Sequence, residues 1–270
     1  MRIARYVVGD QIQFGAVELA ADGEEHPDSV ATLTSDPLAG PVNYTGERHL
    51  LSDVRLLAPV IPRSKVVGIG RNYAAHAAEL GNVVPDEPLV FLKPNTSVIG
   101  PGEAIVRPAT TSNLHYEGEL AVVIGRICRD VPKDRVPDVI FGYTVANDVT
   151  ARDLQNTDGQ WTRAKGYDTF CPLGPWIVTH LGLDEVGNLE IRTRLDGALV
   201  QDSTTSLMVR DVATLVSYVS SFVTLLPGDV ILTGTPAGVG PMTPGQHVAV
   251  EIDQIGTLDN VVVEDAGADS

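Results

Sequence analysis

The sequence predicts an α+β protein that is mostly β. Short apolar runs rich in β-branched residues recur along the chain, and glycine or proline bounds each of them. Only two stretches show the apolar period of about 3.6 residues that is typical of an amphipathic helix. The 270 residues are 43% hydrophobic and 20% charged, which is enough apolar material for a large core. We therefore expect a sheet-dominated fold.

The N-terminal part predicts a small β-rich unit. Residues 2–8 and 11–20 have the composition of short strands, and a turn-rich stretch covers residues 22–28. Residues 40–43 form a connection, and residues 54–60 lead the chain into its main body.

The main body is expected to consist of strands with few long helices. Pro59 and Pro62 mark its start, so we predict a small N-terminal β-rich domain over residues 1–61, a main domain over 62–265 and a frayed tail over 266–270. Helical periodicity is convincing over residues 73–80 and 212–224. The strands are expected at residues 66–69, 89–92, 120–124, 139–145, 176–179, 189–195, 230–233 and 248–252.

Composition excludes several classes of function. The formal net charge of −16 repels phosphate backbones and anionic membranes, so neither nucleic acid nor a membrane is an expected partner. No apolar run reaches the roughly 18–20 residues of a membrane span, and the N-terminus lacks the apolar core of a signal peptide, so we expect a cytoplasmic protein. Two cysteines make no disulfide framework; Cys171 is either a reactive thiol or a buried, inert one.

Three carboxylates stand at strand-like runs. Glu117 and Glu119 lie two residues apart, which on a strand places them on one face about 7 Å apart. Asp148 ends a second run, from residue 141. Neighbouring carboxylates repel each other unless a cation joins them, and an all-oxygen set favours Mg²⁺, Mn²⁺ or Ca²⁺ over Zn²⁺. The alternative is a solvated strand face.

A histidine and a glutamate share one face of the first predicted helix. His76 and Glu79 are three residues apart. A carboxylate beside an imidazole fixes its tautomer and raises its basicity, which suits it to take a proton from water. An ordinary surface pair is the alternative.

Further polar residues are ambiguous taken singly. Lys93 ends an apolar strand, where reaching out to solvent is the usual behaviour. Arg152 and Gln155 lie three residues apart after Asp148, so a helix there would point both toward it; Arg152 could grip a substrate carboxylate through two hydrogen bonds, or form a surface ion pair. Lys165 stands in a polar loop, and Thr235 lies in a glycine-rich turn that could face a site.

Taken together, these residues fall in six motifs, and from about residue 64 to 264 the chain resembles the fumarylacetoacetate hydrolase family. The resemblance is to its short acylpyruvase, oxaloacetate-decarboxylase and 2-hydroxyhepta-2,4-diene-1,7-dioate isomerase-like members. The motifs occur in the family's order: residues 70–76 (GRNYAAH), 91–94 (FLKP), 115–120 (HYEGEL), 147–153 (NDVTARD), Lys165 with 170–175 (FCPLGP), and 228–236 (GDVILTGTP).

The resemblance implies a role for each candidate residue. It implies a mixed β-sandwich roll for the main, catalytic domain, and a homodimer. The implied metal ligands for Mg²⁺ or Mn²⁺ are Glu117, Glu119 and Asp148. The implied catalytic residues are the water-activating dyad His76 and Glu79, on a segment that orders when substrate binds, and Lys165, which stabilises the developing negative oxygen. The implied substrate contacts are Arg152, Gln155, Lys93 and Thr235.

The implied function is metal-dependent hydrolysis of a carbon–carbon bond in an acylpyruvate-type 2,4-dioxo acid, such as fumarylpyruvate, through a metal-stabilised pyruvate enolate. The expected partner is thus a small anionic 2-oxo acid. Oxaloacetate decarboxylation and 2-hydroxyhepta-2,4-diene-1,7-dioate isomerisation use the same enolate chemistry and stay open as alternatives. A remote alternative is a non-catalytic metal-binding module that serves assembly.

Overall fold

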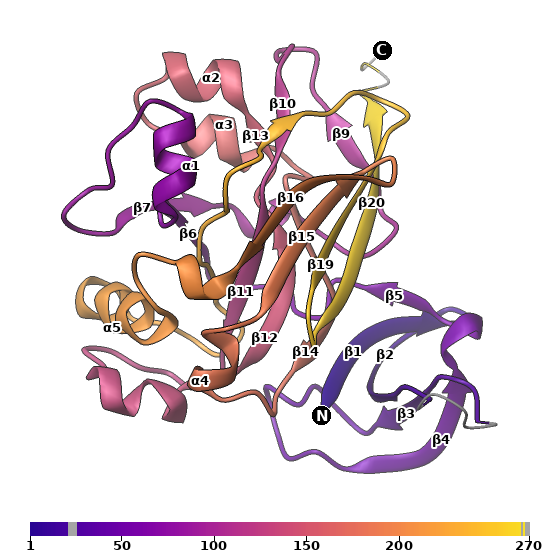
Figure 1. Ribbon diagram of the computed structural model, residues 1–270. Coiled ribbons are helices and arrows are strands. Elements are labelled where there is room, and N and C mark those ends of the chain that lie inside the picture. Colours follow the sequence, from indigo (N-terminus) through magenta and orange to yellow (C-terminus); the bar gives the residue numbers. More distant parts are fainter. Residues whose placement is uncertain (21–25, 266, 268–270) are drawn as a thin grey trace.

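Strands dominate the computed structural model, which describes residues 1–20, 26–265 and 267 (Figure 1). The turn predicted over residues 22–28 is therefore described only from residue 26 onward. The tail predicted over residues 266–270 lies outside the described residues, apart from residue 267.

A mixed 12-stranded sheet forms the body of the molecule. Most neighbouring strands are antiparallel, but β17 and β6 run parallel, as do β14 and β8. Two strands lie off the main path: β5 (Arg55–Leu57) pairs with β1, and β8 (Val98–Ile99) pairs with β14. The main path runs β4 (Tyr44–Leu50), β3 (Ser29–Leu33), β2 (Gln11–Glu18), β1 (Arg2–Val8), β14 (Cys171–Val178), β12 (Ile140–Asn147), β11 (Gly118–Ile124), β17 (Val230–Leu232), β6 (Val66–Gly70) and β7 (Leu89–Lys93).

Two smaller sheets complete the fold. The five-stranded sheet consists of β16 (Ala198–Thr204), β15 (Glu190–Leu195), β19 (His247–Ile252), β20 (Gly256–Glu264) and β9 (Ile105–Arg107). The three-stranded sheet consists of β13 (Thr150–Ala151), β10 (Leu114–Tyr116) and β18 (Gly240–Pro241).

The five-stranded sheet packs on the 12-stranded sheet, and the main core lies between them. Alternate residues of β11, Leu120 and Val122, are fully buried in the same apolar cluster as Ile252 and Leu258 of the smaller sheet. Because successive side chains on a strand point to opposite faces, the odd-numbered residues of β11 point away from the five-stranded sheet. The mostly-β sandwich that the sequence predicts is therefore the observed fold.

The helices are short and lie at the rim of the sheets. Figure 1 shows α1, α2 and α3 grouped at one end of the sandwich and strands β1 to β4 at the other. Their bounds are α1 (Ala74–Glu79), α2 (Arg152–Thr157), α3 (Thr162–Gly166), α4 (Leu183–Val186) and α5 (Val212–Phe222). Short 3₁₀ turns cover Leu51–Asp53, Asn95–Ser97, Lys133–Asp138 and Thr205–Leu207. None of the helices described is long and apolar enough to span a membrane.

Every strand and both helices that the sequence predicts are present, most of them with shifted ends. The largest shift is in β14, which starts at Cys171 although the prediction begins at residue 176, because its two prolines and a glycine hide the strand pattern. At the N-terminus, Arg2 and Ile3 pair with Val178 and Ile177, so one sheet continues from the N-terminal strands into the main body. The division at residue 61 stays a prediction.

Candidate active site

Strand β11 positions the first two carboxylates. Gly118 faces the five-stranded sheet, where a Cβ would lie 2.4 Å from Oγ1 of Thr193, so only glycine lets the sheets approach this closely. Glu117 and Glu119 flank this glycine and project to the other side. Both are almost completely buried, so the solvated strand face considered as an alternative is wrong.

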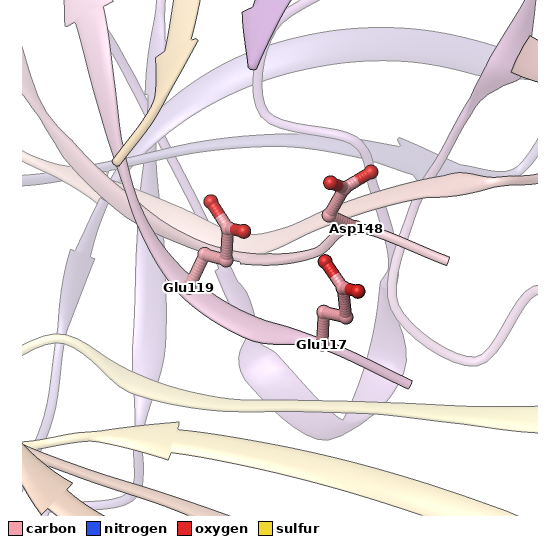
Figure 2. A group of neighbouring side chains, drawn as sticks. All are labelled: Glu117, Glu119 and Asp148. Atoms are coloured by element: carbon pink, nitrogen blue, oxygen red, sulfur yellow. The ribbon is translucent and has the colours of Figure 1, made fainter. Parts of the chain in front are cut away.

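Strand pairing brings the third carboxylate to the first two. β12 runs antiparallel to β11 with Gly118 opposite Asn147, so the next residue, Asp148, emerges beside Glu117. The Asp148 amide donates a 2.8 Å hydrogen bond to the Glu117 carbonyl oxygen. One carboxylate oxygen from each residue lies within 4.8 Å of the others, and Figure 2 shows the three groups gathered together. The predicted trio therefore converges.

Three buried cations surround these carboxylates. Lys165, from α3, donates to Glu117 at 2.7 Å and to Asp148 at 2.6 Å. Arg152, from α2, donates to Glu117 and is itself buried, so the surface ion pair considered for it is wrong. Lys93 does not reach solvent either: its Nζ lies 2.5 Å from Asp148.

The pKa values of the two glutamates in the trio are shifted in opposite directions. Burial opposes ionisation of Glu117, but the nearby Lys165 and Arg152 outweigh it and lower the Glu117 pKa. Burial likewise opposes the charge on Lys165, whose pKa is nevertheless raised by Asp148 and Glu117. Burial raises the Glu119 pKa well above its usual value, and the charges of Asp148 and Glu117 raise it further.

The surroundings of Glu119 show whether a metal ion fits between the three carboxylates. It accepts a 2.7 Å hydrogen bond from the Gly234 amide, yet within the described chain it forms no ion pair with a cationic side chain. A buried carboxylate without a cation is costly, and an ion seated between the three carboxylates would remove that cost. The all-oxygen donor set matches a hard divalent cation. The residues present therefore fit such an ion.

The His76–Glu79 pair lies on α1 as predicted. Nδ1 of His76 is 3.4 Å from Oε2 of Glu79, and the Gly238 amide donates to both Glu79 oxygens. Glu79 is exposed, but His76 is only 5% exposed, so the imidazole is not part of an ordinary surface pair. Burial lowers the His76 pKa, and the charges of Arg152 and Lys165 lower it further, outweighing Glu117 and Glu79.

One cavity of about 380 Å³ connects these groups. It is lined by eight of the ten predicted site residues: His76, Glu117, Glu119, Asp148, Arg152, Gln155, Lys165 and Thr235. The other two do not line it: Glu79 contacts His76, and Lys93 contacts Asp148. The substrate contact predicted for Lys93 stays a prediction; the contact that the structure gives it is with the carboxylate.

Two of the cavity-lining residues to which sequence reasoning gave no role form a cation–aromatic contact. Arg71 and Trp161 form part of the cavity wall, with Cζ of Arg71 5.9 Å from the centroid of the Trp161 ring. Arg71 belongs to the GRNYAAH motif, so its signal was present in the sequence. Trp161 belongs to none of the six motifs, and a single aromatic residue in a predicted loop does not indicate a role in a site.

Family models match nearly the whole chain. The model "Fumarylacetoacetate (FAA) hydrolase C-terminal" matches residues 65–263, and the model "Rv2993c-like, N-terminal" matches residues 1–59. Protein Rv2993c of Mycobacterium tuberculosis is 51% identical over 263 residues, covering 97% of this chain and 98% of the relative. The mitochondrial oxaloacetate tautomerase fahd2 of Xenopus laevis is 43% identical, covering 80% and 71%.

Solved structures agree with this assignment. A 5-carboxymethyl-2-hydroxymuconate delta-isomerase from Mycobacterium smegmatis has a TM-score of 0.88 and 49% identity, covering 98% of this chain and 100% of the other. A fumarylpyruvate hydrolase from Pseudomonas aeruginosa, solved with Mn²⁺ and pyruvate, has a TM-score of 0.71 and 35% identity, covering 78% and 92%. The chain, with its buried acidic trio and its mostly-β sandwich, belongs to the fumarylacetoacetate hydrolase family.

Proposed function

We propose that the protein is a divalent-metal-dependent enzyme that hydrolyses a carbon–carbon bond in an acylpyruvate-type 2,4-dioxo acid, such as fumarylpyruvate. One observation carries the proposal: a buried histidine, His76, which Glu79 contacts from the solvent side, and three buried carboxylates meet at one cavity. The carboxylates alone would account for binding a 2-oxo acid through an ion. Hydrolysis also needs a base that activates water, and His76 is available for that task.

The carboxylate trio is the place for the ion. Glu117, Glu119 and Asp148 would hold Mg²⁺ or Mn²⁺, which when bound supplies Lewis-acid polarisation of the 2-oxo group. Arg152 and Lys165 line the same cavity and contribute positive charge for the substrate carboxylate. That charge is needed because the net charge of −16 repels an anionic substrate.

His76 begins the reaction by taking a proton from water. Its Nδ1 faces Glu79, which leaves Nε2 for the water molecule. Its lowered pKa keeps the ring neutral and able to accept the proton at neutral pH. The water oxygen then bonds to the distal carbonyl carbon of the substrate, and the bond between that carbon and carbon 3 breaks.

The electron pair of the broken bond moves into the pyruvate part, which becomes an enolate. Lys165 stabilises this negative charge, because the neighbouring carboxylates keep its ammonium group protonated. The proton held by His76 returns to carbon 3. One water is consumed, and the products are pyruvate and a carboxylic acid.

Isomerisation or tautomerisation of a 2-oxo acid is the second candidate. The names of the Mycobacterium smegmatis and Xenopus laevis relatives support it. Such a reaction moves a proton between atoms of one substrate and consumes no water, so it needs the charged cavity but not a water-activating dyad. Decarboxylation of oxaloacetate likewise consumes no water and needs no water-activating dyad.

The test is a substrate panel measured with Mg²⁺ or Mn²⁺ and after EDTA treatment. The panel contains fumarylpyruvate, acetylpyruvate, oxaloacetate and 2-hydroxyhepta-2,4-diene-1,7-dioate. We expect metal-dependent pyruvate release from fumarylpyruvate, followed with a coupled lactate dehydrogenase assay. Isomerisation of the dienoate without pyruvate release from any acylpyruvate would favour the second candidate, and no turnover at all would favour a non-catalytic module.

A further inference from the structure

Arg71 is a cation in the cavity wall that the proposed reaction does not use. It lines the same 380 Å³ cavity as the carboxylate trio and is half-buried. Arg152 and Lys165 each hold a carboxylate of the trio, whereas Arg71 forms no ion pair with any carboxylate in the described part of the chain. Its guanidinium donors are therefore available to an anion that enters the cavity.

An aromatic wall holds the Arg71 side chain. Its Cζ lies 5.9 Å from the centroid of the Trp161 ring, within the range of a cation–π contact. Trp161 packs on the chain at Gly70, where a Cβ would be only 2.8 Å from the ring. The Trp161 ring also meets Phe91 edge-on, with 5.6 Å between centroids. The guanidinium is thus held before any ligand binds, which lowers the entropic cost of binding.

The Arg71 backbone adopts a conformation that does not favour arginine. Its φ is 57°, in the left-handed region preferred by glycine and asparagine. The next residue fixes this turn, because the Asn72 side chain donates to the Thr233 and Arg210 carbonyl oxygens. An arginine at a position where glycine or asparagine would be less strained points to a function of its side chain.

We propose that Arg71 binds a carboxylate at the distal end of the substrate and makes the protein selective for 2-oxo diacids. This inference rests on the proposed function, because it assumes that the 2-oxo acid end lies at the trio. A guanidinium binds a carboxylate through two parallel hydrogen bonds, which a methyl group cannot replace. The cavity volume is typical of ligand pockets and leaves room for a chain longer than pyruvate.

The test measures binding rather than turnover. Isothermal titration of the Mn²⁺-loaded protein compares 2-oxoadipate with 2-oxohexanoate, which has the same chain length but ends in a methyl group. We expect the wild-type protein to bind 2-oxoadipate about 10- to 100-fold more tightly. Arg71→Asn should reduce this ratio to about 3 or less and leave 2-oxohexanoate binding unchanged, since asparagine tolerates the left-handed backbone.

Two further variants sharpen the result. Arg71→Lys keeps the charge but not the paired donors, so it should retain only part of the preference. Arg163→Gln is the matched control, because this arginine also lies near Trp161 but is exposed and paired with Asp158; its ratio should equal that of the wild type. The proposal is wrong if the wild type shows no preference, if Arg71→Asn keeps the wild-type ratio, or if that variant weakens both acids equally.

The same data separate this proposal from the proposed function. If the wild type turns over no acylpyruvate but shows the Arg71-dependent preference, the proposed function fails and the Arg71 assignment stands. If turnover is intact and the preference is absent, only the Arg71 assignment fails.

Discussion

At the residue scale, environment decides what each side chain can do. Glu117 and Glu119 are chemically identical and two residues apart, yet cations lower the pKa of one while burial and neighbouring carboxylates raise that of the other. His76 and Cys171 are both buried, but beside different charged groups: Glu117, Arg152 and Lys165 act on His76, whereas Lys93, Asp148 and Glu119 act on Cys171. Each of these two side chains gives a test.

Removing the His76 imidazole should separate two reactions. We expect His76→Ala to lower acylpyruvate hydrolysis by about 100-fold or more, because general-base catalysis is lost. Oxaloacetate decarboxylation should persist, since it needs no activated water. Parallel assays of pyruvate release and carbon dioxide release measure this, with Mn²⁺ affinity as the control for an intact site. Equal loss of both activities would contradict this division of tasks.

The Cys171 thiol should be inert in the folded protein. It is completely buried, and burial raises its pKa to about 12. At pH 8 the group is therefore protonated, and only the thiolate reacts. In a Cys128→Ser background, Ellman's reagent should label no thiol in the native protein and one thiol after unfolding in guanidinium chloride. Rapid labelling of the native protein would instead support a reactive cysteine.

At the element scale, the two faces of β11 have separate tasks. One face packs on the five-stranded sheet through Leu120 and Val122, and the other presents the two glutamates. Gly118 stands between those glutamates and permits the sheets to approach. A substitution on the packing face should therefore also weaken metal binding at the trio.

Gly118→Ala tests this coupling. The added Cβ would lie 2.4 Å from Oγ1 of Thr193 and 2.9 Å from Cγ1 of Val250, so these side chains or the strand must shift. We expect a loss of about 1–3 kcal/mol in the free energy of unfolding, together with weaker Mn²⁺ binding. Urea unfolding in EDTA isolates the first effect, and calorimetric titration gives the second. Gly40→Ala is the control, since its Cβ would meet nothing closer than 3.9 Å; an equal effect of both substitutions would refute the argument.

Strand β20, which the sequence did not predict, carries a polar residue in the interior. β20 (Gly256–Glu264) has Asn260 at a fully buried position, which breaks the apolar alternation. The Asn260 amide donates to the carbonyl oxygens of Gly100 and Glu103, so the structure satisfies it. Such a partner is far away in sequence, and no local pattern could have indicated it.

At the scale of the whole molecule, the site couples metal binding to stability. The trio sits where β11 begins and β12 ends, and Arg152 of α2 and Lys165 of α3 form ion pairs with it. An ion that binds only the folded chain stabilises it by mass action. Overall charge acts in the same direction, because a divalent cation reduces the net charge of −16.

Mn²⁺ should therefore raise the melting temperature. At about 100 times the Kd the expected gain is about 2.7 kcal/mol, which corresponds to several degrees and is measurable by calorimetry. Glu119→Gln should abolish the Mn²⁺-dependent shift, while its melting temperature in EDTA should be no lower than that of the wild type, because the neutral amide adds no buried charge and its oxygen can still accept the Gly234 hydrogen bond. A full Mn²⁺ shift in this variant would exclude Glu119 as a ligand.

Local sequence by itself determined the fold class, half of the strands described, both amphipathic helices and the residue types of the site. Short-range periodicity and the order of the motifs carry that information. Only the tertiary structure decided that Asp148 emerges beside Glu117, that Lys93 lies buried behind it, and that Arg71 keeps its donors open. The physical reason is that strand pairing joins segments distant in sequence, and burial and charge at a position depend on which segments meet there.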